Sequence, residues 1–261
     1  PTIAAVSPFF NEKSISRRIV REPVESVTDL NTCSTEIIAS DMKLSLFRRH
    51  CIALLTGLWL TGGWALAQSA GPAAPSGTTI LILGDSLSAE YGLKRGTGWV
   101  ALLEQRLGQE KLAATVVNAS ISGDTTSGGR SRLPALLAQH RPTVVVIELG
   151  GNDALRGLPL TMTQDNLTAM TRAAQQAGAK VLLAGMQVPP NYGQDYTQRF
   201  SETFATVAKS TKAALVPFLL KGVADGPNAA AMFQADRIHP REEAHPTILN
   251  TMWPAIKNLL K

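Results

Sequence analysis

The sequence predicts an α/β domain in which a parallel sheet is covered by helices on both faces. Two observations in residues 78–261 favour this class. Short apolar runs rich in Val, Ile and Leu alternate with longer segments whose apolar residues recur at helical spacing. This alternation is typical of successive strand–helix–strand units with right-handed crossovers, which make the strands parallel. Because ligands bind such sheets at the carboxyl ends of the strands, we look for chemistry in the loops that follow the strands.

Each expected element rests on its local pattern. The runs TTILILG at 78–84 and TVVVIELGGND at 143–153 are typical of strands that are buried on both faces. Further strands are expected at 114–120, 179–186 and 213–218. Helices are expected at 99–110, 164–178, 196–211 and 244–260, and residues 133–140 are expected to end a further helix. Five strands therefore alternate with helices along one domain, which spans residues 78–261.

The residues before this domain carry the pattern of an exported protein. Residues 42–67 predict a signal peptide, with Lys43, Arg48 and Arg49 before an apolar run at 51–66 and a small-residue cleavage site at 65–67. An uncleaved membrane anchor is the alternative, but the run is shorter than the roughly 20 residues that a spanning helix needs. We therefore expect a periplasmic or secreted bacterial protein without stable membrane insertion after cleavage.

The two segments that flank the signal peptide are assigned no fold. Residues 1–41 lack periodicity, and we interpret them as an upstream extension, either disordered or not native, with translation starting at Met42. Residues 68–77 are small residues with two prolines, which is typical of a linker.

Composition excludes several classes of function. The formal charge is +5, but the basic residues are scattered, so no nucleic-acid surface is predicted. Both cysteines, Cys33 and Cys51, precede the domain, which therefore has no disulfide and no thiolate ligand. There is no HExxH motif, and no GxGxxG motif follows a strand, so we expect neither a metal nor a dinucleotide cofactor.

The predicted loops contain a candidate nucleophile and base. Ser86 follows the first strand, where a serine is also often a helix cap. Of the three histidines in the domain, His140 suits a helix end and His245 lies at the start of the last helix, where an imidazolium is disfavoured. His239 remains, and Asp236 lies three residues before it, so that a turn could bring the carboxylate to Nδ1.

Donors for an oxyanion are also available at the strand ends. Gly123 follows the second strand and can bring its amide close to a substrate because it lacks Cβ. Asn152 follows the third strand and offers a side-chain amide, while Ser86 offers its own backbone N–H. We expect Asp85 to brace the serine turn beside the substrate rather than to react.

These residues lie in motifs that resemble the SGNH, or GDSL, hydrolases. The motifs are LILGDSLSAEYG at 81–92, VVNASISGDT at 116–125, VIELGGNDALRG at 146–157, VPPNYG at 188–193 and DRIHPREEAHP at 236–246. They are similar to those of the bacterial group of multifunctional thioesterases, proteases, lysophospholipases and arylesterases. The resemblance implies a three-layer αβα, flavodoxin-like fold with a five-stranded parallel sheet and no cofactor.

The resemblance also implies roles for individual residues. The four naming residues of the family correspond to Ser86, Gly123, Asn152 and His239, and Asp236 completes a catalytic triad. The loop 186–196 helps to line the acyl groove in this family, and here it contains the expected substrate-binding residues Val188, Pro189, Asn191 and Tyr192. Its Val-Pro-Pro sequence departs from the family pattern, which leaves the preferred acyl length open.

The predicted function is therefore that of a serine esterase. Its expected substrates are small acyl esters, including aryl esters, short- and medium-chain esters and lysophospholipids, together with thioesters such as acyl-CoA, and we expect a monomer. One alternative is a polysaccharide O-acetyl esterase, although Trp99 and Trp253 provide few aromatic side chains for a sugar platform. A second alternative is a non-catalytic flavodoxin-like binding domain.

Overall fold

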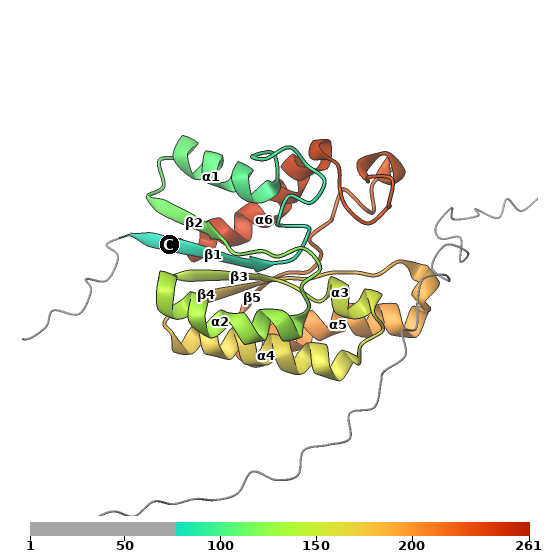
Figure 1. The fold of residues 1–261 in the computed structure, drawn as a ribbon, viewed down its shortest axis with the longest axis horizontal. Helices are drawn as coiled ribbons and strands as arrows, with labels where there is room; N and C mark the ends of the chain where they lie inside the picture. The colour runs from blue at the N-terminus through green and yellow to red at the C-terminus, as the bar shows by residue number, and fades with distance from the viewer. Residues whose placement is uncertain (1–76) are drawn as a thin grey trace, which may run out of the picture. The chain divides into compact units, whose positions relative to one another are not determined.

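A five-stranded parallel sheet forms the centre of the domain in the computed structural model, which describes residues 77–261. The strand order is β2-β1-β3-β4-β5 (Figure 1). The strands are β1 (Thr78–Gly84), β2 (Ala114–Asn118), β3 (Val144–Glu148), β4 (Lys180–Ala184) and β5 (Ala214–Val216). The upstream extension 1–41, the signal peptide 42–67 and the linker, except for Gly77, lie outside the described residues.

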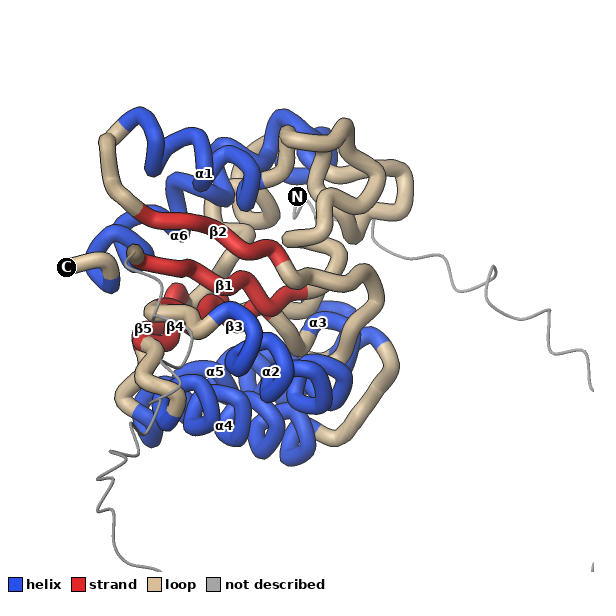
Figure 2. Tube along the Cα trace, turned by 60° about the vertical axis from the view of Figure 1, so that its left-hand side comes forward, coloured by secondary structure: helices blue, strands red, loops and turns tan. Residues whose placement is uncertain are grey.

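Helices cover both faces of this sheet. Two of them, α1 (Trp99–Gln109) and α6 (His245–Leu259), pack together on one face. The opposite face is covered by α2 (Thr126–His140), α4 (Leu160–Gln176) and α5 (Gln194–Thr211) (Figure 2). Short helices complete the domain: α3 (Gly151–Leu155), η1 (Pro190–Tyr192), η2 (Ala229–Met232) and η3 (Glu242–Ala244). No helix among the described residues is long and apolar enough to cross a membrane.

The continuous apolar runs of β1 and β3 follow from burial on both faces. Alternate residues of β1 point to opposite faces. Leu81 and Leu83 join the core beneath α2, α4 and α5, while Ile80 and Ile82 join the core beneath α1 and α6. All four side chains have no exposed surface. The three-layer architecture and the five parallel strands that the sequence predicts are thus confirmed.

Two elements differ from the sequence-based expectation. The third strand ends at Glu148, because Gly150 has a φ of 125° and starts a turn into the short helix α3. Helix α2, of which the sequence indicates only the C-terminal part at 133–140, begins at Thr126, and the side chain of Thr125 caps it by accepting a hydrogen bond from the Gly128 amide. Both differences lie in loops that follow strands.

The topology determines where these loops meet. In the order β2-β1-β3-β4-β5 the chain reverses its direction of travel across the sheet between β1 and β3. In doubly wound sheets this switch point opens a crevice at the carboxyl ends of the strands. The segments after β1, β2 and β3, which carry the candidate residues, all leave the sheet at this end.

Candidate active site

Ser86, His239 and Asp236 form a continuous hydrogen-bonded chain. The Ser86 Oγ lies 2.8 Å from Nε2 of His239, and Nδ1 of the same ring lies 2.6 Å from Oδ2 of Asp236. An ionised carboxylate can only accept, so Nδ1 carries the proton and Nε2 is free to accept from the serine hydroxyl. This arrangement has the geometry that a nucleophile, a base and an orienting acid require.

The loop that follows η2 holds Asp236 in position. Its Oδ1 accepts hydrogen bonds from the backbone amides of Ile238 and His239, at 3.0 Å each. Burial alone would raise the pKa of Asp236, but the hydrogen bonds from the His239 ring and from these amides lower it below its usual value. The residue therefore stays ionised and keeps the imidazole oriented.

A buried carboxyl group supports the turn that carries Ser86. Oε2 of Glu148, at the end of β3, accepts from the Asp85 amide at 3.1 Å and from the Ser88 hydroxyl at 2.7 Å. The indole N–H of Trp99 donates to the same hydroxyl at 3.2 Å. Burial raises the pKa of Glu148 well above its usual value, and the neighbouring Asp85 carboxylate raises it further. Glu148, at the end of β3, thus fixes the turn that carries Ser86.

Asp85 connects the serine turn to Asn152. Its Oδ1 accepts from the Leu87 amide at 3.0 Å, and its Oδ2 accepts from Nδ2 of Asn152 at 2.9 Å. Burial raises the pKa of Asp85 to about 6, against the lowering effect of these bonds and of the His239 ring. Because a carboxylate cannot donate, the bond fixes the NH₂ group of Asn152 toward Asp85 and leaves its second N–H for another acceptor.

The loop between β2 and α2, residues 119–125, brings Gly123 to the same end of the sheet. Gly123 has a φ of 79°, which favours glycine, and its carbonyl accepts from Nη2 of Arg156 at 2.7 Å. Arg132 holds the loop from α2, donating to the carbonyl of Ala119 and to the carboxylate of Asp124. Two arginines therefore orient the peptides around Gly123.

The short helix α3 is anchored by Asp153, which is fully buried. Its Oδ2 accepts from the amide of Thr126 at 2.8 Å, at the first residue of α2. A carboxylate at a helix N-terminus is stabilised by the exposed N–H groups there. This bond joins the loop with Gly123 to the helix with Asn152.

The loop 186–196, expected to line an acyl groove, follows β4, which lies two strands away from β1. Val188 is buried in the core, whereas Pro189 and Tyr192 are half-buried and Asn191 is exposed. The Tyr192 ring stacks on Tyr196 at a centroid distance of 6.2 Å. Val188 therefore supports the loop from below, and its neighbours form the surface that a ligand could touch.

The other two histidines of the domain are separate from this arrangement. Nδ1 of His245 accepts from the Trp99 amide at 3.0 Å, which ties α6 to the start of α1. Burial lowers the pKa of His245, so the ring is neutral and can accept. His140 is the last residue of α2. Neither ring takes part in the hydrogen-bonded chain from Ser86 to Asp236.

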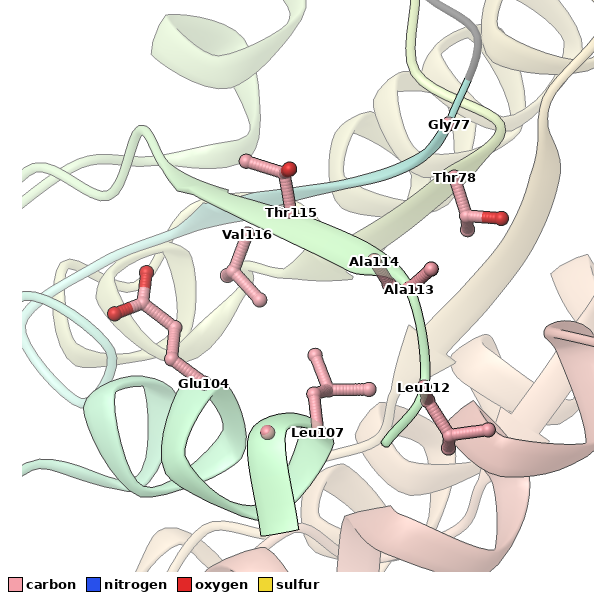
Figure 3. Close-up of a pocket in the computed structure, with 10 residues that line it drawn as sticks. Gly77, Thr78, Glu104, Leu107, Leu112, Ala113, Ala114, Thr115 and Val116 are labelled. Carbon is pink, nitrogen blue, oxygen red and sulfur yellow. The ribbon is translucent and has the colours of Figure 1, made fainter. Parts of the chain in front are cut away.

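A separate pocket lies at the opposite end of the strands (Figure 3). It is lined by the start of β1, by the start of β2 and by α1, and Glu104 is the one titratable side chain among its lining residues. None of the predicted site residues belongs to it. The pocket therefore has no part in the arrangement around Ser86.

Comparisons with known proteins agree with this geometry. Residues 82–246 match the model of the GDSL-like lipase/acylhydrolase family. The chain belongs to the GDSL-like lipase/acylhydrolase family. A relative named esterase TesA, from Pseudomonas aeruginosa, is 50% identical over 206 residues, which cover 79% of this chain and all of the relative. A thioesterase 1/protease 1/lysophospholipase L1 from Escherichia coli is 42% identical over 72% of this chain and 87% of its own.

A solved structure of a GDSL-like relative has the same fold. The psychrotrophic esterase EstA from a Pseudoalteromonas species, in a structure inhibited by monoethylphosphonate, is 43% identical. It matches with a TM-score of 0.66 over 70% of this chain and 98% of its own. The prediction of a hydrolase of the GDSL-like family is thereby confirmed, and the chain is an ester-cleaving enzyme. The alternatives, a polysaccharide deacetylase and a non-catalytic domain, are not favoured.

Several residues around the site were not predicted from the sequence. They are Ser88, which donates to Glu148, Trp99, which donates to the Ser88 hydroxyl, and Arg132 and Arg156, which donate to main-chain carbonyls. Glu148 and Asp153 do carry a signal, because acidic residues beside the glycine turn after an apolar strand are expected to anchor loops through hydrogen bonds, although the sequence names no partners for them.

Proposed function

We propose that Ser86 is the nucleophile of an esterase that works through an acyl-enzyme. Nε2 of His239 takes the hydroxyl proton as Oγ attacks the carbonyl carbon of the substrate, and Asp236 stabilises the resulting imidazolium. The amides of Ser86 and Gly123, with Nδ2 of Asn152, bind the oxyanion. The imidazolium then protonates the leaving alcohol or thiol. Water repeats the cycle on the acyl-enzyme and releases the acid.

One observation carries this proposal. A serine hydroxyl, an imidazole and a carboxylate, which come from opposite ends of the domain, are joined at 2.8 and 2.6 Å at the switch point of the sheet. A structural serine cap would require none of these contacts. Asp85 contributes by orienting Asn152 through its 2.9 Å bond, which is a positioning role beside the substrate.

We infer that the substrates are small acyl esters and thioesters with an apolar acyl chain. Ile121 lies in the Gly123 loop and Leu155 is the last residue of α3, and these two large apolar residues are 53% and 44% exposed. We assign the loop with Pro189, Asn191 and Tyr192, which follows β4, to binding of the acyl chain. Aryl esters, lysophospholipids and acyl-CoA fit this chemistry, and relatives carry the names esterase, arylesterase and thioesterase 1/protease 1/lysophospholipase L1.

The proposed setting is outside the cytoplasm. Residues 42–67 have the pattern of a signal peptide, so we propose a periplasmic or secreted monomer that has no stable membrane insertion and does not bind nucleic acid. N-terminal sequencing of the exported protein tests this setting: a start near Gln68 supports it, and an intact Met42 contradicts it.

The nucleophile is tested by Ser86→Ala. We expect hydrolysis of p-nitrophenyl butyrate to fall by a factor on the order of 10⁴ or more, because the hydroxyl that attacks is gone. Labelling by a fluorophosphonate probe should disappear as well. Ser201→Ala, in α5, removes a hydroxyl that bonds only within its own helix and serves as the control. Wild-type turnover by a folded Ser86→Ala variant would refute the assignment.

A further inference from the structure

We propose that Tyr91 and Gln234 form a clamp that holds the His239 ring against Ser86, so that both are positioning residues for the acylation step. The proposal rests on the proposed function of Ser86 and His239. The clamp joins two loops: the segment after β1, which carries Ser86, and the segment 232–241, which carries Asp236 and His239. In Figure 1 these two segments lie beside each other near the ends of the strands.

Gln234 bridges the two loops with its side-chain amide. Nε2 donates to the carbonyl of Tyr91 at 2.9 Å and to the carbonyl of Pro240 at 3.1 Å, so both amide hydrogens have acceptors. The backbone amide of Gln234 donates to the carbonyl of His239 at 2.8 Å. The main chain of Gln234 therefore holds the loop that carries His239, and its side chain holds the loop that carries Ser86.

The nucleophile loop is shaped to receive this side chain. Gly92 follows Tyr91 and has a φ of 70°, a backbone conformation that residues with a side chain rarely adopt. A Cβ at this position would lie 2.2 Å from Oε1 of Gln234. Only a residue without a Cβ lets the amide of Gln234 approach the Tyr91 carbonyl, so the two loops fit each other at this point.

Tyr91 makes the second contact of the clamp through its ring. The centroids of the Tyr91 and His239 rings are 4.3 Å apart, with an angle of 37° between the planes. The Tyr91 side chain remains 50% exposed, so burial of its own surface does not account for its position. Its backbone amide donates to the carbonyl of Ser86 at 3.4 Å, which connects the ring to the nucleophile turn.

The clamp restrains the position of the His239 ring relative to the Ser86 hydroxyl. Apart from it, the Ser86 and His239 side chains are joined by one hydrogen bond between residues 153 positions apart in the chain. A displacement of about 1 Å between reacting groups can reduce the rate on the order of 100-fold. The π face of Tyr91 also favours the imidazolium that forms as the serine attacks. Both contributions act on acylation and not on substrate binding.

The test uses four single variants of the full chain with p-nitrophenyl butyrate as the substrate. Gln234→Glu is nearly isosteric but replaces the amide donors with acceptors that face two carbonyls. Tyr91→Leu removes the ring, while Tyr91→Phe keeps it. Gly92→Ala keeps the Gln234 side chain but displaces it from the Tyr91 carbonyl.

We expect kcat to fall about 10- to 100-fold in Gln234→Glu, Tyr91→Leu and Gly92→Ala, with KM changed less than about threefold. Tyr91→Phe should retain wild-type kcat.

Two controls make the outcome specific. Gln198→Glu changes an exposed glutamine of α5 and should leave kcat unchanged. The urea midpoint of each variant reports folding, and if Gln234→Glu unfolds, Tyr91→Leu and Tyr91→Phe still decide the question. The double variant Tyr91→Leu/Gln234→Glu should lose less than the product of the single losses, because the two residues act as one unit.

The clamp proposal is refuted if the folded variants Tyr91→Leu and Gln234→Glu keep the wild-type kcat, whether or not their KM rises. It is also overturned if Tyr91→Phe loses as much activity as Tyr91→Leu. These results leave Ser86→Ala inactive and therefore contradict only the clamp. Failure of the proposed function has a different signature, which is activity that survives Ser86→Ala.

Discussion

At the scale of single residues, the carboxyl group of Glu148 is the feature of the site whose burial costs the most free energy of folding. It is completely buried, its Oε2 accepts two hydrogen bonds, and no partner for its Oε1 occurs among the described residues. Asp85, a second buried carboxyl group, lies next to it. Two adjacent buried carboxyl groups are retained in this position because they fix the serine turn and Asn152 from below.

Glu148 gives a pH dependence of stability with a definite sign. Its pKa is raised in the folded protein by burial and by Asp85, so the folded state keeps a proton that the unfolded state releases above about pH 4.5. The free energy of unfolding should therefore fall as the pH rises from 5 to 8, by up to about 1.4 kcal/mol per pH unit while one proton is released.

Glu148→Gln tests this, because its carbonyl can accept both hydrogen bonds without a charge. Urea unfolding between pH 5 and 8 should give a flatter dependence for this variant than for the wild type. Glu104→Gln removes one exposed carboxylate and controls for net charge. Parallel curves for Glu148→Gln and the wild type would contradict the prediction.

The sequence predicts the triad but not the contacts that support it. Counting histidines isolates His239, and a spacing of three residues pairs it with Asp236, because both arguments depend only on local chemistry. Gln234 and Tyr91 give no such signal, since the partners of Gln234 are main-chain carbonyls that any residue possesses. The position of a carbonyl depends on the folded loop and cannot be read from side-chain types.

At the scale of elements, close packing between strand ends depends on a glycine. Gly185 directly follows β4, and its amide donates to the Val216 carbonyl at 2.7 Å. A Cβ at this position would lie 2.3 Å from the Pro217 carbonyl oxygen, a main-chain atom that cannot rotate away. The register between β4 and β5 thus requires a residue without a side chain here.

A pair of glycine substitutions tests this. Gly185→Ala should lower the free energy of unfolding by on the order of 2 kcal/mol, because β5 must shift. Gly108→Ala, in the exposed part of α1, meets no atom within 4 Å and should raise it by about 0.5–1 kcal/mol through helix propensity. Chemical denaturation measures both values. Equal effects of the two substitutions would show that crowding at Gly185 is unimportant.

The elements predicted well are those with long patterns. All five strands and five long helices occur where apolar periodicity predicts them, because burial against the sheet requires that pattern. Helix α3 was missed, since five residues are too few for periodicity and a turn at Gly150 defines it. The sequence leaves the start of α2 open for a related reason: its first turns contain Gly128 and Gly129, which weaken any helical pattern.

At the scale of the whole molecule, the described residues form two hydrophobic cores, one on each face of the sheet. The buried residues of both clusters lie between Ile80 and Ile256, and every proposed site residue lies in the same range. The domain boundaries that the sequence predicts, with residues 1–77 outside the domain, therefore remain a proposal with a direct test.

A chain that begins at Gln68 should have the same urea midpoint and the same kcat/KM for p-nitrophenyl butyrate as the full chain, because no core residue of the described domain is removed. A chain that begins at Ile82 removes the first four residues of β1, the strand between β2 and β3, and should not fold. Loss of folding in the Gln68 chain would move the domain boundary upstream.

The long separation between Ser86 and His239 also affects how the enzyme is made. The proposed nucleophile belongs to the first strand-to-helix segment, and its proposed base comes only 153 residues later, shortly before the terminal helix. A nascent or truncated polypeptide can therefore present the hydroxyl but has no means to deprotonate it. Under the proposed mechanism, ester cleavage therefore requires a chain that has been synthesised at least as far as His239.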